Sequence, residues 1–362
     1  MDASILSALM SKVLKGEKEF KIQFYLEAVR DALINMANAP QEQSYQKAFS
    51  ESFKSLKSGM SSLDEVLSPG DRDRLSEIFT IKEFSQEIIT EIAEAITENA
   101  ATPAVLRDAV TKIAADRAKE LANFQSLLNQ LTYYHLTPKE NDDDEAQVGF
   151  KLPREIFSNN FSGLIDELNF LKRFIRLVAE AEGGDPEGIK VGTISTTDPV
   201  FWLVVAYGVA KSIGSATTWC LDTWKKIEDI RNVRAQTAKL SAFKPEEIEA
   251  IFGAKIKEQV DKAIEKKVAE MTVGIEDKAR KNEVKNGLRP ALRQFLARVE
   301  RGLTVDIRYL PRPAEKGDSD ESLAEVSQKK TEIQEVASKL VFQRPEGEPI
   351  LELEGPPVKA AA

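Results

Sequence analysis

Through the first 138 residues, apolar positions recur at three- and four-residue steps, which is the period of an amphipathic helix. These stripes occupy segments 17–38, 41–58 and 80–98. Thr102 and Pro103 then supply a capping hydroxyl and a proline at a first helical position, so a long helix is expected from there to Pro138. Arg117 stands in the apolar stripe of that helix. Residues 1–138 are therefore predicted to form a helical bundle.

The pattern changes after this segment. Residues 139–147 (KENDDDEAQ) are acidic and lack apolar anchors, as in a linker. Apolar and polar residues then alternate in three stretches, the pattern of half-buried strands. The alternating apolar residues are Val148, Phe150 and Leu152; Ile189 and Val191; and Leu303, Val305, Ile307 and Tyr309. Because an isolated strand leaves its backbone groups unpaired, we expect one small sheet in a helix-dominated α+β domain over residues 148–310. Residues 311–362 are predicted to be a largely disordered tail with one candidate helix at 323–342.

The stretch STTDPVFWLVVAYGVAKSIG (195–214) is the most apolar part of the chain. Asp198 followed by Pro199 is typical of a helix start, and no proline follows for forty residues, so a long helix 199–240 is predicted. Its fully apolar part is too short to cross a bilayer, and Lys211 would cost roughly 2.5–3.5 kcal/mol at a membrane centre. A helix buried in the protein or facing a partner is favoured over membrane contact.

Two patterns predict association. Ala206, Ala210, Gly214 and Thr218 are four residues apart, and small side chains at this spacing let another backbone approach closely. The apolar stripe of segment 248–268 also steps by four, so it winds about 200° around its helix and needs several helices or a second chain to cover it. The predicted interaction surface consists of Val200, Trp202, Ala206, Ala210, Gly214, Trp219, Trp224, Ile248, Phe252, Ile256, Val260 and Ile264.

Charge and composition narrow the classes of function. The net charge of −9 over 362 residues argues against bulk attraction to nucleic acid or anionic lipid. The basic stretch 278–301 contains Arg289 and Arg293 one turn apart, but acidic residues interleave with it, so a salt-bridged helix is favoured over a phosphate clamp. Cys220 is the only cysteine, which fits a reducing cytosol and excludes an intramolecular disulfide.

Candidate chemistry is sparse. His135 is the only histidine, so paired-histidine metal motifs are excluded, and a helix-end structural role is favoured over a general base. Cys220 lies in mid-helix between two tryptophans, where core packing is favoured over a reactive thiolate. Phosphate-loop, dinucleotide and nucleophile-elbow motifs do not occur, and no cofactor or metal site is predicted.

The sequence thus favours a cytoplasmic, non-enzymatic helical interaction or scaffold protein that self-associates or binds a protein partner. One alternative is a membrane-acting effector of toxin or anti-phage type, which would use helix 199–224 and associate with a membrane only under some conditions. A second alternative is a hydrolytic enzyme that uses His135 with a nearby glutamate.

Overall fold

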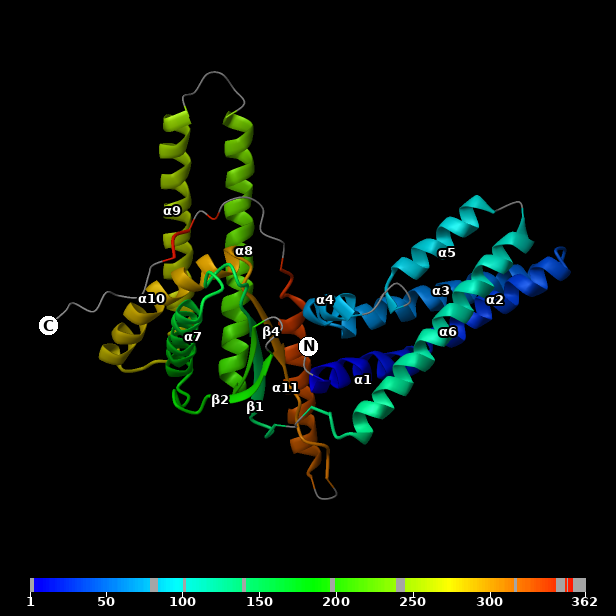
Figure 1. The fold of residues 1–362 in the computed structure, drawn as a ribbon, viewed down its shortest axis with the longest axis horizontal. Coiled ribbons are helices and arrows are strands. Elements are labelled where there is room, and N and C mark those ends of the chain that lie inside the picture. The colour runs from blue at the N-terminus through cyan, green and yellow to red at the C-terminus, as the bar shows by residue number, and fades with distance from the viewer. Residues whose placement is uncertain are drawn as a thin grey trace. The chain divides into compact units, whose positions relative to one another are not determined.

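The computed structural model describes residues 3–78, 84–99, 102–138, 141–195, 199–238, 245–315, 318–342, 349 and 351–353. The chain divides into two compact units, Met1–Lys139 and Glu140–Ala362, which we call the N-terminal and the C-terminal unit. Among the described residues, the first contains six helices, and the second contains five helices and four strands (Figure 1). The predicted fold class, a helical bundle followed by a helix-dominated α+β domain, is confirmed.

The N-terminal unit packs its helices around one apolar core. The helices are α1 (Ala3–Phe20), α2 (Ile22–Asn38), α3 (Gln43–Val66), α4 (Pro69–Ile78), α5 (Glu87–Glu98) and α6 (Pro103–Tyr133). Helix α2 packs against both α3 and α6. Its Leu26 and Leu33 are fully buried together with Leu56 and Met60 of α3 and Val110 of α6. The helical periodicity of the sequence thus corresponds to a shared core.

A buried ion pair explains why Arg117 interrupts the apolar stripe of α6. The Arg117 side chain is fully buried, and its guanidinium donates to both carboxylate oxygens of Glu17 at 2.5 and 3.0 Å. It also donates to Gln23 Oε1 at 3.0 Å. The carboxylate of Glu17 in turn accepts the backbone N–H of Gln23 at 2.7 Å. The charge of Arg117 is therefore matched inside the core by α1.

The C-terminal unit is built on one antiparallel sheet with the order β2-β3-β1-β4. The strands are β1 (Glu145–Lys151), β2 (Lys190–Ser195), β3 (Val200–Ala206) and β4 (Thr304–Arg308). Val148 of β1 lies opposite Leu203 of β3 and Ile307 of β4, which defines the register of β1 with both of its neighbours. The expected small sheet is present, and strand β4, which is distant from the others in sequence, forms one of its edges.

The predicted helix 199–240 is wrong over its first eight residues. Val200–Ala206 form strand β3, and helix α8 begins only at Tyr207 and runs to Ala238. Strand β3 lies inside the sheet, between β2 and β1, and Phe201, Trp202 and Val205 are buried although they point to both faces. An inner strand covered on both faces is apolar at every position, so its sequence does not alternate. Asp198, the expected helix cap, lies outside the described residues.

The remaining helices of this unit are α7 (Phe161–Ala181), α8, α9 (Pro245–Met271), α10 (Lys278–Glu300) and α11 (Asp320–Ser338). Helices α8 and α9 form an antiparallel hairpin whose far ends extend beyond the other helices of the unit (Figure 1). Helix α10 packs against α7, α8 and α9, and α11 packs against α8 and β4. Phe174 of α7 and Phe295 of α10 stack in the core with ring centroids 4.3 Å apart.

The predicted linker 139–147 contains the boundary between the two units, but its described residues are not free of contacts. Strand β1 begins at Glu145, and two of the preceding acids have partners from the C-terminal part of the chain. Lys329 donates to the Asp144 carboxylate at 2.7 Å, and Arg312 lies 3.3 Å from that of Asp143. The candidate helix 323–342 forms as α11, and its Ile333 is buried in the core. Most of the predicted tail beyond residue 342 lies outside the described residues.

Candidate functional site

The α8–α9 hairpin buries the apolar stripe that was expected to bind a partner. Ile256, Val260, Ile264 and Val268 of α9 are all at most 3 % exposed and belong to the core of the C-terminal unit. Helix α9 packs against both α8 and α10, so two neighbours cover the winding stripe. Of the two alternatives for covering this stripe, several helices or a second chain, helices of the same chain cover its part from Ile256 to Val268.

The predicted interaction surface is therefore largely internal. Of its members, Trp202, Ala210, Gly214, Trp224, Ile256, Val260 and Ile264 are buried within the chain. As outward-facing positions these seven are wrong, because the sheet and the neighbouring helices cover them. Val200, Trp219 and Phe252 are half-buried, Ala206 is the exposed end of β3, and the side chain of Ile248 lies outside the described part.

The small-residue stripe of α8 does allow close packing at Gly214, where helix α11 lies against it. A Cβ atom built on Gly214 would lie 2.2 Å from Val336 Cγ1 of α11 and 2.7 Å from Ile307 Cδ1 of β4. Both distances are shorter than any ordinary Cβ contact, so α11 can reach α8 only because residue 214 has no side chain. Tyr207 and Lys211 of α8 then each donate to Glu332 of α11, at 2.8 and 2.7 Å.

A basic groove remains open between α8, α9 and the end of α11. Its volume is about 630 Å³, and we call it the lysine groove. The lysines that line it are Lys211, Lys226, Lys262, Lys266, Lys267 and Lys339. Asp222 and Glu270 are the acidic residues of its lining. Six lysines against two acids make this groove strongly positive in a chain whose net charge is −9.

Three of these lysines are not neutralised. Lys211 pairs with Glu332, Lys262 with Glu258, and Lys267 with Glu270. In contrast, Lys226, Lys266 and Lys339 are exposed and have no acidic partner in the part of the chain that the structure describes. Three unpaired ammonium groups around one groove create a local field that favours an anionic ligand.

The floor of the groove is apolar. Half-buried Trp219 and fully covered Ile227 come from α8, Ala263 comes from α9, and Val336 comes from α11. A groove with an apolar floor and cationic edges can accept a ligand that has one apolar and one acidic side. The lysine groove therefore combines the two kinds of contact that a binding surface needs.

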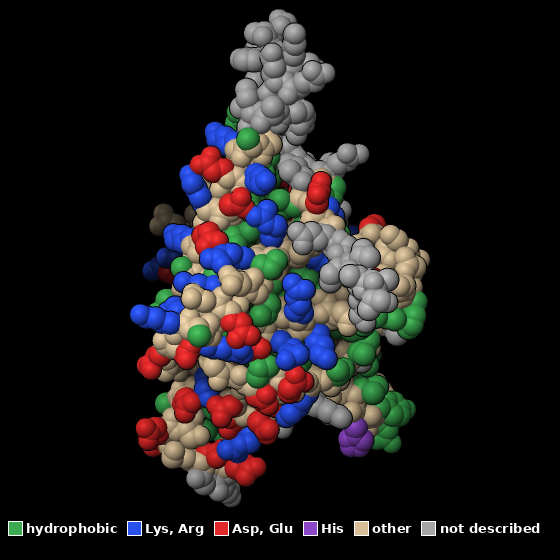
Figure 2. Space-filling model, turned by 90° about the vertical axis from the view of Figure 1, so that its left-hand side faces the viewer, with side chains coloured by type: hydrophobic (Ala, Val, Ile, Leu, Met, Phe, Trp, Pro, Cys, Tyr) green, Lys and Arg blue, Asp and Glu red, His purple; other side chains and the backbone are tan. Residues whose placement is uncertain are grey.

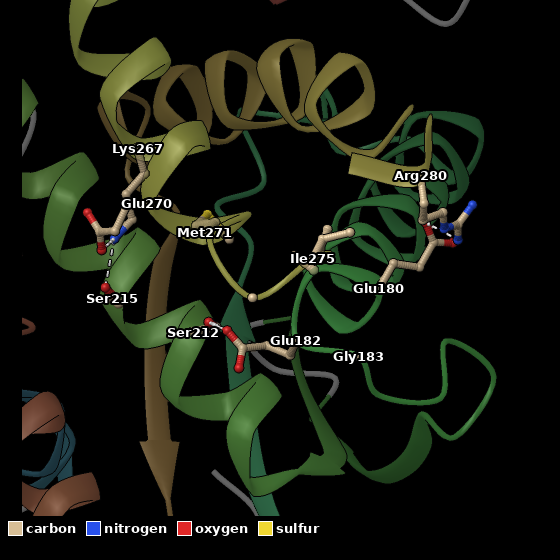
Figure 3. A pocket seen from close by; sticks show the side chains of 12 residues that line it. Glu180, Glu182, Gly183, Ser212, Ser215, Lys267, Glu270, Met271, Ile275 and Arg280 are labelled. Carbon is tan, nitrogen blue, oxygen red and sulfur yellow. Dashed lines mark hydrogen bonds and ion pairs between the residues drawn. The ribbon is translucent and has the colours of Figure 1, made fainter. Parts of the chain in front are cut away.

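A smaller polar cavity of about 480 Å³ adjoins the groove and shares Ser215, Lys267 and Glu270 with it (Figure 3). The side chain of Lys267 is 4 % exposed and donates to Ser215 Oγ at 2.7 Å and to Glu270 at 2.6 Å. Arg280 pairs with Glu180 at 3.0 Å on one side of the cavity, and Ser212 donates to Glu182. Both cations of this cavity thus have an acidic partner, whereas Glu182 is hydrogen-bonded to a neutral hydroxyl.

The contact between Ser215 and Lys267 does not form a nucleophile and its base. Lys267 is held in an ion pair with Glu270, and an ammonium group has no lone pair that could accept the proton of Ser215. The arrangement instead anchors the end of α9 to α8. Lys267 is therefore a structural cation whose charge is paired with Glu270 in the wall of the lysine groove.

The two residues considered for chemistry, Cys220 and His135, are not among the residues that line the groove or the cavity. Cys220 is fully buried in α8, and this burial raises the pKa of its thiol well above the ordinary value, so it stays protonated at neutral pH. The expected core role of Cys220 is confirmed. His135 lies in the N-terminal unit just after α6, exposed and at a φ of 57°. Its backbone N–H donates to the carbonyl of Thr132 at 3.0 Å, as at a helix C-terminus.

The basic stretch on α10 is salt-bridged, as expected. Arg289 donates to both carboxylate oxygens of Glu265 on α9, at 2.5 and 3.1 Å, and Arg293 pairs with Asp261. The guanidinium of Arg289 lowers the pKa of Glu265 below its usual value. Figure 2 shows the same alternation, with acidic and basic side chains interspersed over one face of the molecule. These arginines hold α10 to α9 and do not form a phosphate clamp.

The described ranges contain neither a candidate membrane-spanning helix nor a candidate metal site. No helix within the described ranges combines the length and the apolar character that crossing a bilayer requires. In the same ranges, no three His, Cys, Asp or Glu side chains are arranged to hold a metal ion.

The fold and site define an α+β unit with a lysine-lined groove on a helical hairpin. Comparison of the chain with models of protein families, with curated proteins and with solved structures gave no match. The geometry of the groove is therefore the basis on which a function can be proposed for this chain.

Proposed function

We propose that this chain is a protein-interaction module whose lysine groove binds an acidic amphipathic helix of a partner protein. The observation that carries the proposal is the set of exposed lysines without acidic partners, Lys226, Lys266 and Lys339, around an apolar floor. Their charges are neither neutralised by the described residues nor needed to hold the hairpin together.

A helix suits the shape of this groove. Helices α8 and α9 lie side by side, and the seam between two packed helices accepts a third one at an axial distance of about 8–10 Å. The apolar face of such a helix would cover Trp219 and Ala263, and its acidic flanks would meet the lysines on both edges. This is the helix-in-groove mode of peptide recognition.

The lining chemistry favours a protein over a phosphate ligand. The cations of the lysine groove are all lysines, whereas the planar fork of arginine is the better match for bidentate phosphate contacts. Nucleic-acid sites also use aromatic rings on which bases stack, and Trp219, the aromatic residue of the lining, is packed against the core. A helix that carries carboxylates can pair with lysines and does not need an aromatic ring on which to stack.

The proposal is tested by anisotropy of a labelled synthetic helix of about 18 residues, with leucines on one face and glutamates on the other. The full chain should bind it, and Lys226→Glu/Lys266→Glu/Lys339→Glu should weaken binding at least tenfold. Exposed ion pairs are worth about 0.2–1 kcal/mol each, and about 1.4 kcal/mol corresponds to a factor of ten. Charge reversal also replaces each attraction by a repulsion.

A matched control is Lys18→Glu/Lys54→Glu/Lys119→Glu, which changes the net charge by the same amount at exposed positions of the N-terminal unit. It should leave affinity for the acidic helix unchanged. Equal loss in both triple variants would mean that only bulk charge matters. Binding of an oligonucleotide or of anionic vesicles, but not of the acidic helix, would overturn the proposal in favour of those ligands.

A further inference from the structure

A short segment near the C-terminus lies against the end of helix α10, on elements that do not line the lysine groove. The backbone N–H of Leu351 donates to Glu300 Oε2 at 2.9 Å, and the Leu351 carbonyl accepts from Arg301 at 2.6 Å. The carbonyl of Glu352 accepts from Gln294 Nε2 at 3.4 Å. Three side chains at the end of α10 thus bind the main chain of two consecutive residues.

These side chains are held in place by their own neighbours. Glu300 is 3 % exposed and Gln294 is 8 % exposed. The side-chain oxygen of Gln294 accepts from Arg298 at 3.1 Å, and Arg298 makes a two-pronged pair with Glu167 of α7 at 2.6 and 2.9 Å. Gln294 is therefore pre-positioned by a buried network, and Arg301 by its hydrogen bond to the Ala297 carbonyl at 2.8 Å, which lowers the entropy lost on binding.

The segment contributes little besides this backbone contact. Leu351 is half-buried and packs against the core, Glu352 is exposed, and Leu353 is half-buried. A contact of this size is weak for a free peptide, but an intramolecular ligand acts at an effective concentration on the order of 1 mM. The site is thus filled because its ligand belongs to the same chain.

We propose that the end of α10 is a binding site for an extended segment with leucines at alternate positions, and that residues 351–353 fill it as an exchangeable internal ligand. The donor and acceptor groups of Glu300 and Arg301 define the backbone register, and the two leucines define the side chains that fit. A segment of the same chemistry in another protein binds this site by displacing the chain's own one.

The test uses the full chain carrying Glu352→Cys with a nitroxide spin label. Residue 352 is exposed, whereas the native Cys220 is fully buried, so the label reports on the C-terminal segment. We expect a restricted electron paramagnetic resonance spectrum that becomes mobile when Leu351→Asp or Arg301→Ala is added. Arg72→Ala, which removes an exposed arginine of the N-terminal unit, is the control and should leave the spectrum restricted.

Exchange is then tested by adding a peptide with the sequence of residues 348–356. About half of the label should become mobile near 1 mM peptide, which matches the effective concentration of the tethered segment. A scrambled peptide should have no effect. A label that is mobile from the start would overturn the docked segment, and a label that stays restricted at several times this concentration would overturn exchange.

Discussion

Removing the guanidinium of Arg117 should destabilise the N-terminal unit about as much as truncating a large apolar side chain of its core. Arg117→Met keeps much of the side-chain volume but leaves the carboxylate of Glu17 inside the core without its cation. Glu17 is 8 % exposed as a residue, and among its recorded hydrogen bonds only the one from the backbone of Gln23, at 2.7 Å, would remain. The variant therefore converts a paired charge into an unpaired buried one.

The magnitude follows from how buried ion pairs behave. Breaking such a pair by removing one partner costs about 3–5 kcal/mol, because the remaining charge is desolvated without compensation. Replacing both partners by apolar residues is often neutral or stabilising by about 1–4 kcal/mol. We therefore expect Glu17→Met/Arg117→Met to be at least about 3 kcal/mol more stable than Arg117→Met.

Two optical probes separate the units in a urea titration. All three tryptophans of the chain, Trp202, Trp219 and Trp224, lie in the C-terminal unit, so their fluorescence follows that unit, while far-ultraviolet circular dichroism follows the helices of both. Arg117→Met should move part of the dichroism transition to lower urea and leave the fluorescence midpoint in place. A loss below about 1 kcal/mol, or a double variant no more stable than the single one, would refute the role assigned to the pair.

Two further predictions concern the docking of α11. Hydrogen bonds from Lys211 and two other neighbours lower the pKa of Glu332 from the ordinary 4.5 to about 2, so its contribution to stability is complete above about pH 5 and lost as the pH falls towards 2. The difference in unfolding free energy between the parent and Glu332→Gln, followed by tryptophan fluorescence, should shrink over this range; a difference that does not change with pH would contradict it. Gly214→Ala should destabilise the C-terminal unit by about 1–3 kcal/mol through its clash with Val336, whereas Gly253→Ala, with nothing within 4 Å of the new atom, should stabilise it by up to about 1 kcal/mol. The same sign for both changes in a thermal or urea titration would refute the contact.

Much of the fold could be predicted because helical periodicity and alternation are local signals. The bundle and strands β1, β2 and β4 all follow from them. Strand β3 could not be predicted in this way, because its apolar run continues without a break into Val209 and Ala210 of α8. A short apolar run fits an inner strand and a buried helix equally well. The difference lies in the pairing of β3 with β1 and β2, which no local pattern records.

The partners of the acidic segment 139–147 could not be predicted for a related reason. Its composition is typical of a solvated linker, because apart from Lys139 all of its charged residues are acids. In the fold, Lys329 and Arg312 reach Asp144 and Asp143 from more than 160 residues away. The composition of a segment indicates how much apolar surface it can bury. It does not show whether a charged residue distant in the sequence will pair with it.

The candidate site could not be predicted from apolar stripes, and the reason is physical. An apolar stripe marks a surface that must be covered. In the hairpin, neighbouring helices of the same chain cover it, so Val260 and Ile264 are not accessible to another protein. The groups available to a partner are the exposed ones that have no partner within the fold. Lys262 and Lys266 are both exposed lysines on α9, yet one is paired with Glu258 and the other has no acidic partner among the described residues. That distinction depends on rotamers and on neighbouring elements, so the lysine groove becomes visible only after every internal ion pair has been assigned.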